Sequence, residues 1–146
     1  MTDIRQLTEA DRQQWLAQRL ALWPREDATA FDAEMAATLA TPATMVAFGA
    51  FEDGRLVGFA EAAERPWGEG CETAPVAWLE GIYIEPEARR AGIGRLLVDA
   101  VCNWARVREY QELGSDVLEE NAGSLASHAN WGFEETTRVV NFRIRL

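Results

Sequence analysis

The chain has 146 residues, of which 48% are hydrophobic, so it is long enough for one domain with a proper core. Its 24 acidic and 14 basic residues give a net charge of −10, which disfavours a nucleic-acid partner, because phosphate binding needs a basic patch. One histidine and two cysteines without ligand spacing disfavour a metal site, and without a signal peptide or membrane-length apolar run we expect a soluble, cytoplasmic protein that does not interact with membranes.

The first half of the chain predicts two helices and a hairpin after a short strand. Thr8 begins "TEAD", which resembles a capping box, and Pro24 ends the helix that follows. Asp53-Gly54 lies between two apolar runs and is a strong turn signal. The predicted elements here are a strand at 3–7, helices at 8–23 and 28–40, and a hairpin within 44–63.

The second half alternates strands and helices after a loop at 65–74. Its predicted elements are a strand at 76–84, a helix at 92–109, a short strand ending in Asp116, a helix from Asn121 to Gly132, and a final strand at 139–146. The full order, β-α-α-β-β-β-α-β-α-β, predicts a mixed α+β domain with no linker or internal repeat.

A glycine-spaced turn precedes the helix at 92–109. The chain reads Arg89-Arg90-Ala91-Gly92-Ile93-Gly94 after Pro86. Backbone N–H groups at a helix start favour an anion, and a diphosphate fits them, with the arginines adding charge-assisted contacts. A tight strand-to-helix turn without any ligand explains the glycines equally well.

Two motifs together resemble the GCN5-related N-acetyltransferase (GNAT) superfamily. Arg89, Gly92 and Gly94 match its Arg/Gln-x-x-Gly-x-Gly/Ala signature, and Asn121 followed by "WGF" at 131–133 matches a second one. The resemblance implies a mostly antiparallel sheet flanked by helices, with a parallel pair splayed at an acetyl-coenzyme A site. The residues it assigns to acetyl-coenzyme A are Ile82, Tyr83, Ile84, Arg89, Arg90, Ala91, Gly92, Ile93, Gly94 and Asn121.

A subgroup resemblance spans nearly the whole chain. The segments "DIRQLT", Trp-Pro at 23–24, "LEGI" at 79–82, "SD" at 115–116, "EN" at 120–121 and "GFEETTRV" at 132–139 are similar to the aminoglycoside 6'-N-acetyltransferases. This resemblance implies transfer of acetyl to the 6'-amine of an aminoglycoside. It also implies a homodimer, in which the apolar final strand could pair across subunits.

Glu80 interrupts an apolar strand and is the best candidate to bind or deprotonate the amine. Strand alternation puts it on one face with Trp78 and Ile82 unless a bulge intervenes. A carboxylate there is costly unless it is paired or lies in a wet cleft, so the alternative is a buried ion pair with an arginine. Asp116 could complete an anionic pocket with Glu80, or could merely cap a loop.

The remaining candidates are assigned more weakly. His128 stands where many acetyltransferases of the superfamily have a tyrosine that protonates the leaving thiolate, and the alternative is a packed helix histidine. Trp23 and Trp67 could form an aromatic floor under an amino sugar, and Glu120 belongs to the "EN" match.

Two other functions fit the same residues. The acceptor could be another polyamine, a small amine or a protein N-terminus, because an acidic site suits any polycation. The chain could instead be an acyl-coenzyme A-binding module without catalysis, although the set Glu80, Asp116 and His128 argues against this.

Overall fold

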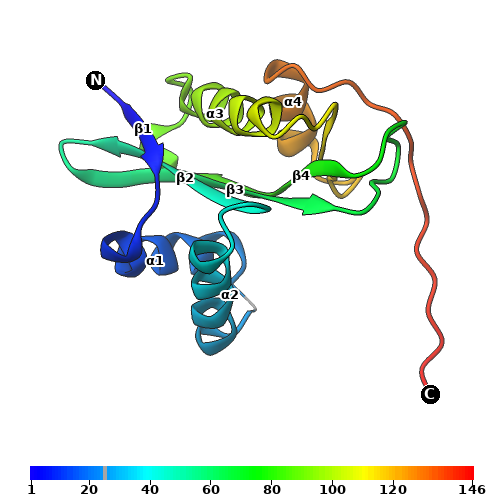
Figure 1. Ribbon diagram of the computed structural model, residues 1–146, viewed down its shortest axis with the longest axis horizontal. Coiled ribbons are helices and arrows are strands. Elements are labelled where there is room, and N and C mark those ends of the chain that lie inside the picture. Colours follow the sequence, from blue (N-terminus) through cyan, green and yellow to red (C-terminus); the bar gives the residue numbers. More distant parts are fainter. Residues whose placement is uncertain (25) are drawn as a thin grey trace.

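A five-stranded sheet separates two layers of helices (Figure 1). The computed structural model describes residues 1–24 and 26–146. The elements are β1 (Asp3–Gln6), η1 (Glu9–Asp11), α1 (Arg12–Leu22), α2 (Ala28–Ala40), β2 (Met45–Glu52), β3 (Arg55–Arg65), β4 (Val76–Ile84), η2 (Pro86–Ala88), α3 (Ile93–Val107), β5 (Leu113–Gly114) and α4 (Ala122–Asn130).

The strands follow one another across the sheet in chain order, β1 to β5. All neighbours are antiparallel except β4 and β5, which run parallel. This parallel pair is bonded at only two positions, Ala77 with Leu113 and Trp78 with Gly114. Beyond Trp78 the two strands diverge, so the predicted fold, a mixed sheet with a splayed parallel pair, is confirmed.

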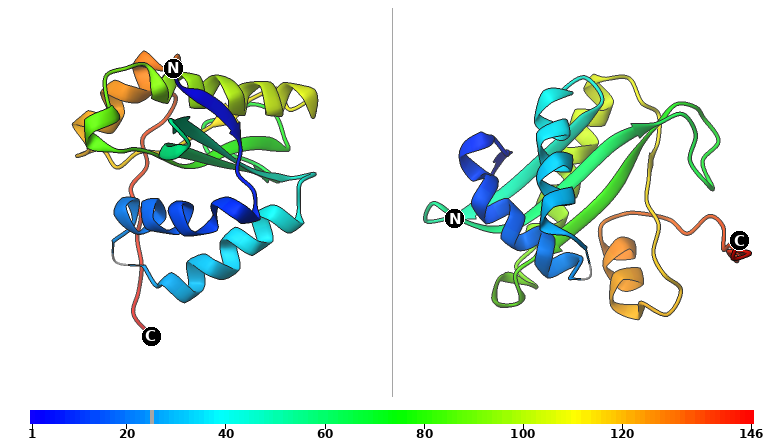
Figure 2. Two further views of the ribbon diagram at one scale, coloured as in Figure 1. Left: turned by 90° about the vertical axis from the view of Figure 1, so that its left-hand side faces the viewer. Right: turned by 90° about the horizontal axis from the view of Figure 1, so that it is seen from below.

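Helices cover both faces of the sheet (Figure 2), and each face has its own apolar core. On the α3 face, Leu97 and Val101 pack against Ala60 and Leu79. On the α1/α2 face, Trp15 and Met35 pack against Leu56 and Phe59. Burying both faces explains why β3 is apolar along nearly its whole length.

Local signals in the sequence account for most of the boundaries. The Thr8 N–H donates to the Asp11 carboxylate at 2.8 Å, as the predicted capping box requires, although the first turn is a 3-10 turn. The hairpin turn places Asp53 and Gly54 at φ 49° and 78°, the left-handed region that glycine favours.

A β-bulge lies in the middle of β4. Glu61 of β3 is opposite Gly81, whereas the next residue, Ala62, is opposite Leu79, so Glu80 is the extra residue. The bulge reverses the alternation of β4. Ile82 therefore packs into the core on the α3 face, while Glu80 lines a cavity on the other face, so the two do not share a face.

The predicted final strand is wrong for a single protomer. Residues 134–146 form neither helix nor strand, and they run past one end of the sheet and away from it (Figure 1, red). A strand needs a hydrogen-bonded neighbour, and this segment has none in the described chain. The strand before Asp116 is also shorter than expected, since β5 is only two residues long.

Within the residues that the structure describes, no helix is both long enough and apolar enough to cross a membrane.

Candidate active site

A cavity of about 460 Å³ lies on the α1/α2 face of the sheet, beside the bulge. It is the cavity that contains two predicted site residues, Trp23 and Glu80. A second cavity, of about 450 Å³, lies around Tyr110 and contains none of them. The described residues that line the first cavity are Arg19, Trp23, Glu26, Phe31, Glu34, Ala37, Thr38, Met45, Glu61, Ala63 and Glu80.

Charge is the main property of this cavity. Its described lining has four carboxylates and one guanidinium, so it favours a cation. The aromatic rings of Trp23 and Phe31 lie 5.7 Å apart and give an apolar wall. An acidic lining with an aromatic wall suits a ligand that carries ammonium groups on an apolar frame.

The most deeply buried carboxylate of the cavity is Glu61, which is 6% exposed. Arg19 donates to it from Nη2 at 3.0 Å, with Nε 2.9 Å from the other oxygen, and the Trp15 indole N–H donates at 2.8 Å. Arg19 also pairs with Glu34 at 2.8 Å and lies over the Phe31 ring. Burial raises the pKa of the Glu61 carboxyl, against the opposing effect of the Arg19 charge.

Glu80 is paired too, but nearer to solvent. Arg65 donates from Nε to Oε1 at 2.9 Å and from Nη2 to Oε2 at 2.7 Å. The two side chains are 34% and 40% exposed. The arginine pairing that the sequence allowed for Glu80 is therefore present, but at the edge of a cavity and not in a buried core.

Asp116 lies next to the same arginine. The Trp78 indole N–H points at Asp116 Oδ1 at 3.4 Å, and the Arg65 guanidinium stacks over the Trp78 ring at 4.4 Å. The structure thus brings the two predicted carboxylates together through Arg65 and Trp78. Asp116 lies just beyond β5 at the edge of the site and outside the cavity lining.

The helix start predicted to hold a diphosphate has the required geometry. Gly92 caps α3 at φ 81°, and no side chain caps the first N–H groups of the helix. Arg90 also has positive φ, 66°, and residues 89–92 are exposed. A row of uncapped N–H groups beside two arginines fits an anionic phosphate.

Gly92 and Gly94, the two glycines of this turn, are required for different reasons. A Cβ on Gly92 would meet nothing within 4 Å, so its positive φ is what requires glycine. A Cβ on Gly94 would lie 2.6 Å from Trp131 Nε1, so Gly94 lets the end of α4 pack on the start of α3. Arg89 instead turns back, donating from Nε to the Ile84 carbonyl at 2.8 Å.

The diverging edge of β4 suits the arm of coenzyme A. Ile82, Tyr83 and Ile84 pair with β3 on one side and lie beyond the last pairing to β5 on the other. The Ile84 carbonyl on this edge already accepts from Arg89 Nε, so an extended ligand would pair with the remaining outward backbone groups, in the manner of an added strand. The predicted acetyl-coenzyme A residues thus run from this edge of β4 to the exposed turn at 89–92, whereas Ile93 and Gly94 are buried at the start of α3.

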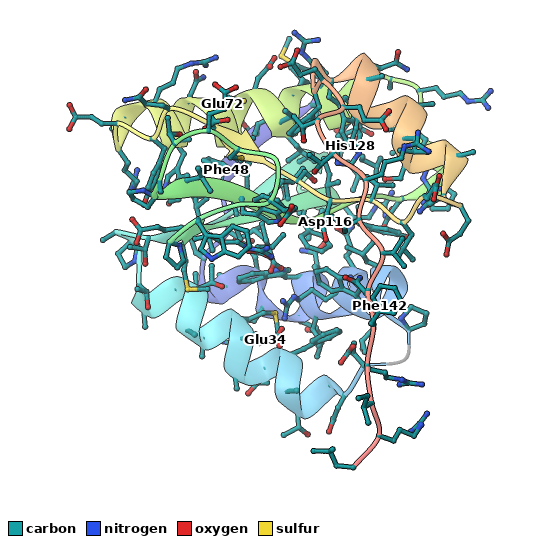
Figure 3. The ribbon with its side chains drawn as sticks, turned by 90° about the vertical axis from the view of Figure 1, so that its right-hand side faces the viewer. Glu34, Phe48, Glu72, Asp116, His128 and Phe142 are labelled. Carbon is teal, nitrogen blue, oxygen red and sulfur yellow. The ribbon has the colours of Figure 1, made fainter. Side chains whose placement is uncertain are left out.

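His128 is held on α4, close to the end of β5 (Figure 3). Its Nδ1 lies 2.9 Å from the Ser124 carbonyl, and its Nε2 lies 2.8 Å from Ser115 Oγ. The Trp131 and Phe133 rings pack on the imidazole at 5.2 and 5.0 Å. A proton on Nε2 would reach solvent or ligand through the Ser115 hydroxyl, so His128 and Ser115 form one unit beside Asp116.

Three predicted residues lie elsewhere or serve the fold. Trp67 is 64% exposed and Glu120 is exposed, and neither lines the cavity. The Asn121 side chain accepts from the Ser124 N–H at 3.1 Å and so caps α4. Both cysteines are free, and burial raises the pKa of the Cys71 thiol, which does not suit a nucleophile.

Sequence reasoning missed part of the cavity. It assigned no site role to the lining residues Arg19, Glu26, Phe31, Glu34 and Glu61. Glu61 carries the same signal as Glu80, an acid inside an apolar strand, in "FAEAA". Helix α2 gave no such signal for Glu34, because acids on amphipathic helices usually face solvent.

The structure combines a splayed parallel pair, an uncapped helix start and an adjoining acidic cavity. These are the features expected of an acetyltransferase of the GNAT fold. The profile described as "Acetyltransferase (GNAT) family" matches residues 4–133. The chain therefore belongs to the GNAT acetyltransferase family.

Full-length relatives place it more narrowly. The chain is 42% identical to an aminoglycoside N(6')-acetyltransferase type 1 of Stenotrophomonas maltophilia, over 98% of this chain and 93% of the relative. It is 39% identical to one of Klebsiella aerogenes, over 96% and 94%. The solved structure of AAC(6')-Iy with the bisubstrate analogue CoA-S-monomethyl-acetylneamine superposes with a TM-score of 0.94 at 35% identity, over 100% and 99%. These matches group the chain with the aminoglycoside 6'-N-acetyltransferases.

Proposed function

We propose that the protein transfers an acetyl group from acetyl-coenzyme A to the 6'-amine of aminoglycosides. The observation that carries this proposal is the acidic, aromatic cavity on one face of β4, beside the diverging edge where the thioester would lie. Glu80 stands at the bulge between the two. We place the reaction in the cytoplasm, where acetyl-coenzyme A is available.

Each step of the proposed reaction has a candidate residue. Glu80 and Asp116 bind the ammonium, and the amine nitrogen, once it has lost a proton to Glu80 or to water, attacks the thioester carbon. A backbone N–H of β4 near Ile82 or Tyr83 stabilises the carbonyl oxygen as it gains charge. The intermediate loses the second amine proton to water as the carbon–sulfur bond breaks, and the His128–Ser115 unit gives a proton to the thiolate, which leaves as coenzyme A.

The acceptor is tested with a matched pair of substrates. Neamine and paromamine differ only at the 6' position, which carries an amine in the first and a hydroxyl in the second. We expect acetyl-coenzyme A-dependent thiol release with neamine, kanamycin and tobramycin and none with paromamine. Turnover on a polyamine or a peptide N-terminus but not on neamine would favour the other acceptors, and coenzyme A binding without any turnover would favour a binding module.

We also propose that the protein is a homodimer joined through its C-terminal segment, residues 134–146. Val140, Phe142, Ile144 and Leu146 are 77–119% exposed and alternate with Asn141, Arg143 and Arg145, which is the pattern of a strand with one buried face. Arg138 pairs with Glu119 at 2.6 Å, but residues 139–146 make no hydrogen bond to the described chain.

A second copy of the chain would give this segment the hydrogen-bonded neighbouring strand that it lacks. The short β5 leaves one edge of the sheet open, and a segment exchanged between protomers would extend that edge in both subunits. We expect a dimer in light scattering at micromolar concentration, and a monomer for the double variant Phe142→Lys/Ile144→Lys. Leu118→Lys, which alters another exposed apolar residue outside the segment, is the control. A monomeric wild-type protein would contradict the dimer.

A further inference from the structure

Arg65, the last residue of β3, is the only described side chain that hydrogen-bonds the Glu80 carboxylate. Its guanidinium contacts both carboxylate oxygens, at 2.9 and 2.7 Å, with the forked geometry that fixes the carboxylate plane. Glu80 stands on a bulge and is exposed, so its backbone alone would leave the carboxylate free to turn. The direction of this carboxylate therefore depends on Arg65.

Arg65 is itself supported by Trp78, which in turn contacts the other predicted carboxylate, Asp116. It stacks on Trp78 at 4.4 Å, and the indole N–H of Trp78 points at Asp116 at 3.4 Å. The hydrogen bonds to Glu80 raise the pKa of Arg65, and the charges of Glu80 and Asp116 add to this effect. One guanidinium between two carboxylates also removes much of the repulsion that would otherwise push the carboxylates apart.

We propose that Arg65 is a positioning residue for the acceptor amine, which it aligns by fixing the Glu80 carboxylate and tying it through Trp78 to Asp116. This inference rests on the proposed function. Each oxygen of Glu80 keeps a lone pair that Arg65 does not use, and these accept the ammonium from the cavity side. A proton placed on Glu80 would disrupt the fork, so Glu80 in this arrangement binds the ammonium and leaves the amine proton to water.

The chain contains a matched control for this arrangement. Arg5 makes a comparable two-point contact to Asp11, through Nη1 and Nη2 at 2.9 Å each, and stacks over Phe51 at 3.9 Å. This pair lies outside the cavity lining. Arg5→Ala therefore removes the same kind of interaction without touching the site, and separates a loss of stability from a loss of alignment.

The experiment compares Arg65→Ala, Arg65→Lys and Arg5→Ala in steady-state kinetics with neamine. We expect Arg65→Ala to lower kcat/KM for neamine by about 10- to 100-fold, as for a misaligned reactant, with the KM for acetyl-coenzyme A unchanged. Arg65→Lys restores charge but not the fork, so it should recover little. Guanidinium chloride far below denaturing concentrations should restore part of the activity of Arg65→Ala, by filling the gap over Trp78, whereas equal sodium chloride should not.

The other possible results would overturn the proposal or the function on which it rests. Equal or higher kcat/KM in Arg65→Ala overturns the proposal, because Arg65 would then be neutral or would obstruct the amine. Full activity in Arg65→Lys, or absence of guanidinium rescue, also overturns it, because charge or folding alone would then account for the loss. Wild-type protein without turnover on neamine overturns the proposed function and this inference with it, whereas failure in the variants alone leaves the function standing.

Discussion

Two arginine–glutamate pairs lie beside one another at the bulge, and they differ in exposure. The side chains of Arg19 and Glu61 are 5% and 8% exposed in the lining of the cavity, whereas those of Arg65 and Glu80 are 40% and 34% exposed at its edge. The first pair has further partners in Trp15 and Glu34. The second has an aromatic support, Trp78, and lone pairs open to the cavity.

This difference indicates what each acid can do. A buried pair is costly to break and cannot exchange partners readily, so Glu61 and Arg19 shape the cavity. An exposed pair contributes little to stability and can share its carboxylate with a ligand, so Glu80 is suited to bind the amine. Four predictions test this division, from the largest expected effect to the smallest.

Glu80→Ala should reduce kcat/KM for the acceptor by about 100- to 1,000-fold, because the amine loses its principal carboxylate. Coenzyme A affinity, measured by calorimetry, and the unfolding midpoint should both stay at wild-type values. Loss of coenzyme A binding would mean that Glu80 serves the cofactor surface and not the amine.

Glu61→Ala should lower the free energy of unfolding by about 3 kcal/mol, because it leaves the buried Arg19 with only one carboxylate partner. Urea denaturation measures this loss. Glu9→Ala removes a carboxylate that is 77% exposed and pairs with Arg12, and it should cost less than about 1 kcal/mol. Equal effects of the two variants would remove the distinction between the buried and the exposed pairs.

Gly81→Ala changes the packing of Trp23 next to the bulge, where Gly81 lies opposite Glu61. An added Cβ would lie 2.5 Å from the Trp23 ring, so the indole, which lines the cavity, must shift. We expect the KM for neamine to rise roughly 10-fold and stability to fall by about 1–2 kcal/mol, as for an overpacked site. An unchanged KM would show that Trp23 does not contact the acceptor.

Asp11→Asn tests an arginine–carboxylate pair that lies outside the cavity lining. Arg5 holds the pKa of Asp11 at about 2, against an ordinary 3.8. A lowered carboxyl pKa stabilises the fold above the unfolded value, and this contribution disappears as pH falls from about 4 to about 2. Urea unfolding should show wild type about 1 kcal/mol more stable than the variant at neutral pH, discounted for the exposed Arg5, and no different near pH 2. Altered turnover on neamine would contradict a purely structural role.

Local chemistry made most elements predictable. Pro24, the Asp53-Gly54 turn and the glycines before α3 set boundaries that depend only on neighbouring residues. Glu80 was identifiable as a site candidate because a charge within an apolar strand is rare. Its partner Arg65 was not, because the bulge that brings these side chains together is a property of two paired strands and leaves no mark on either sequence.

The cavity and the final segment depended on more distant contacts. Glu34 and Arg19 come from different helices and meet Glu61 only because both helices pack on one face of the sheet. Residues 139–146 have the alternation of a strand, but alternation fixes only which side chains share a face. Whether a strand forms depends on an available sheet edge, and within the described residues of one protomer this segment pairs with no sheet edge.

The sequence by itself determined the family, the glycine-spaced helix start and the acid at Glu80, because each rests on residue types at fixed short spacing. Only the tertiary structure decided how Glu80 is held, which other acids join it and what each glycine of the helix start is needed for, because these follow from the bulge and from packing between elements far apart in the chain. Gly94 illustrates this: its place in the motif indicated a ligand, whereas its fit against Trp131 shows a contact between two helices.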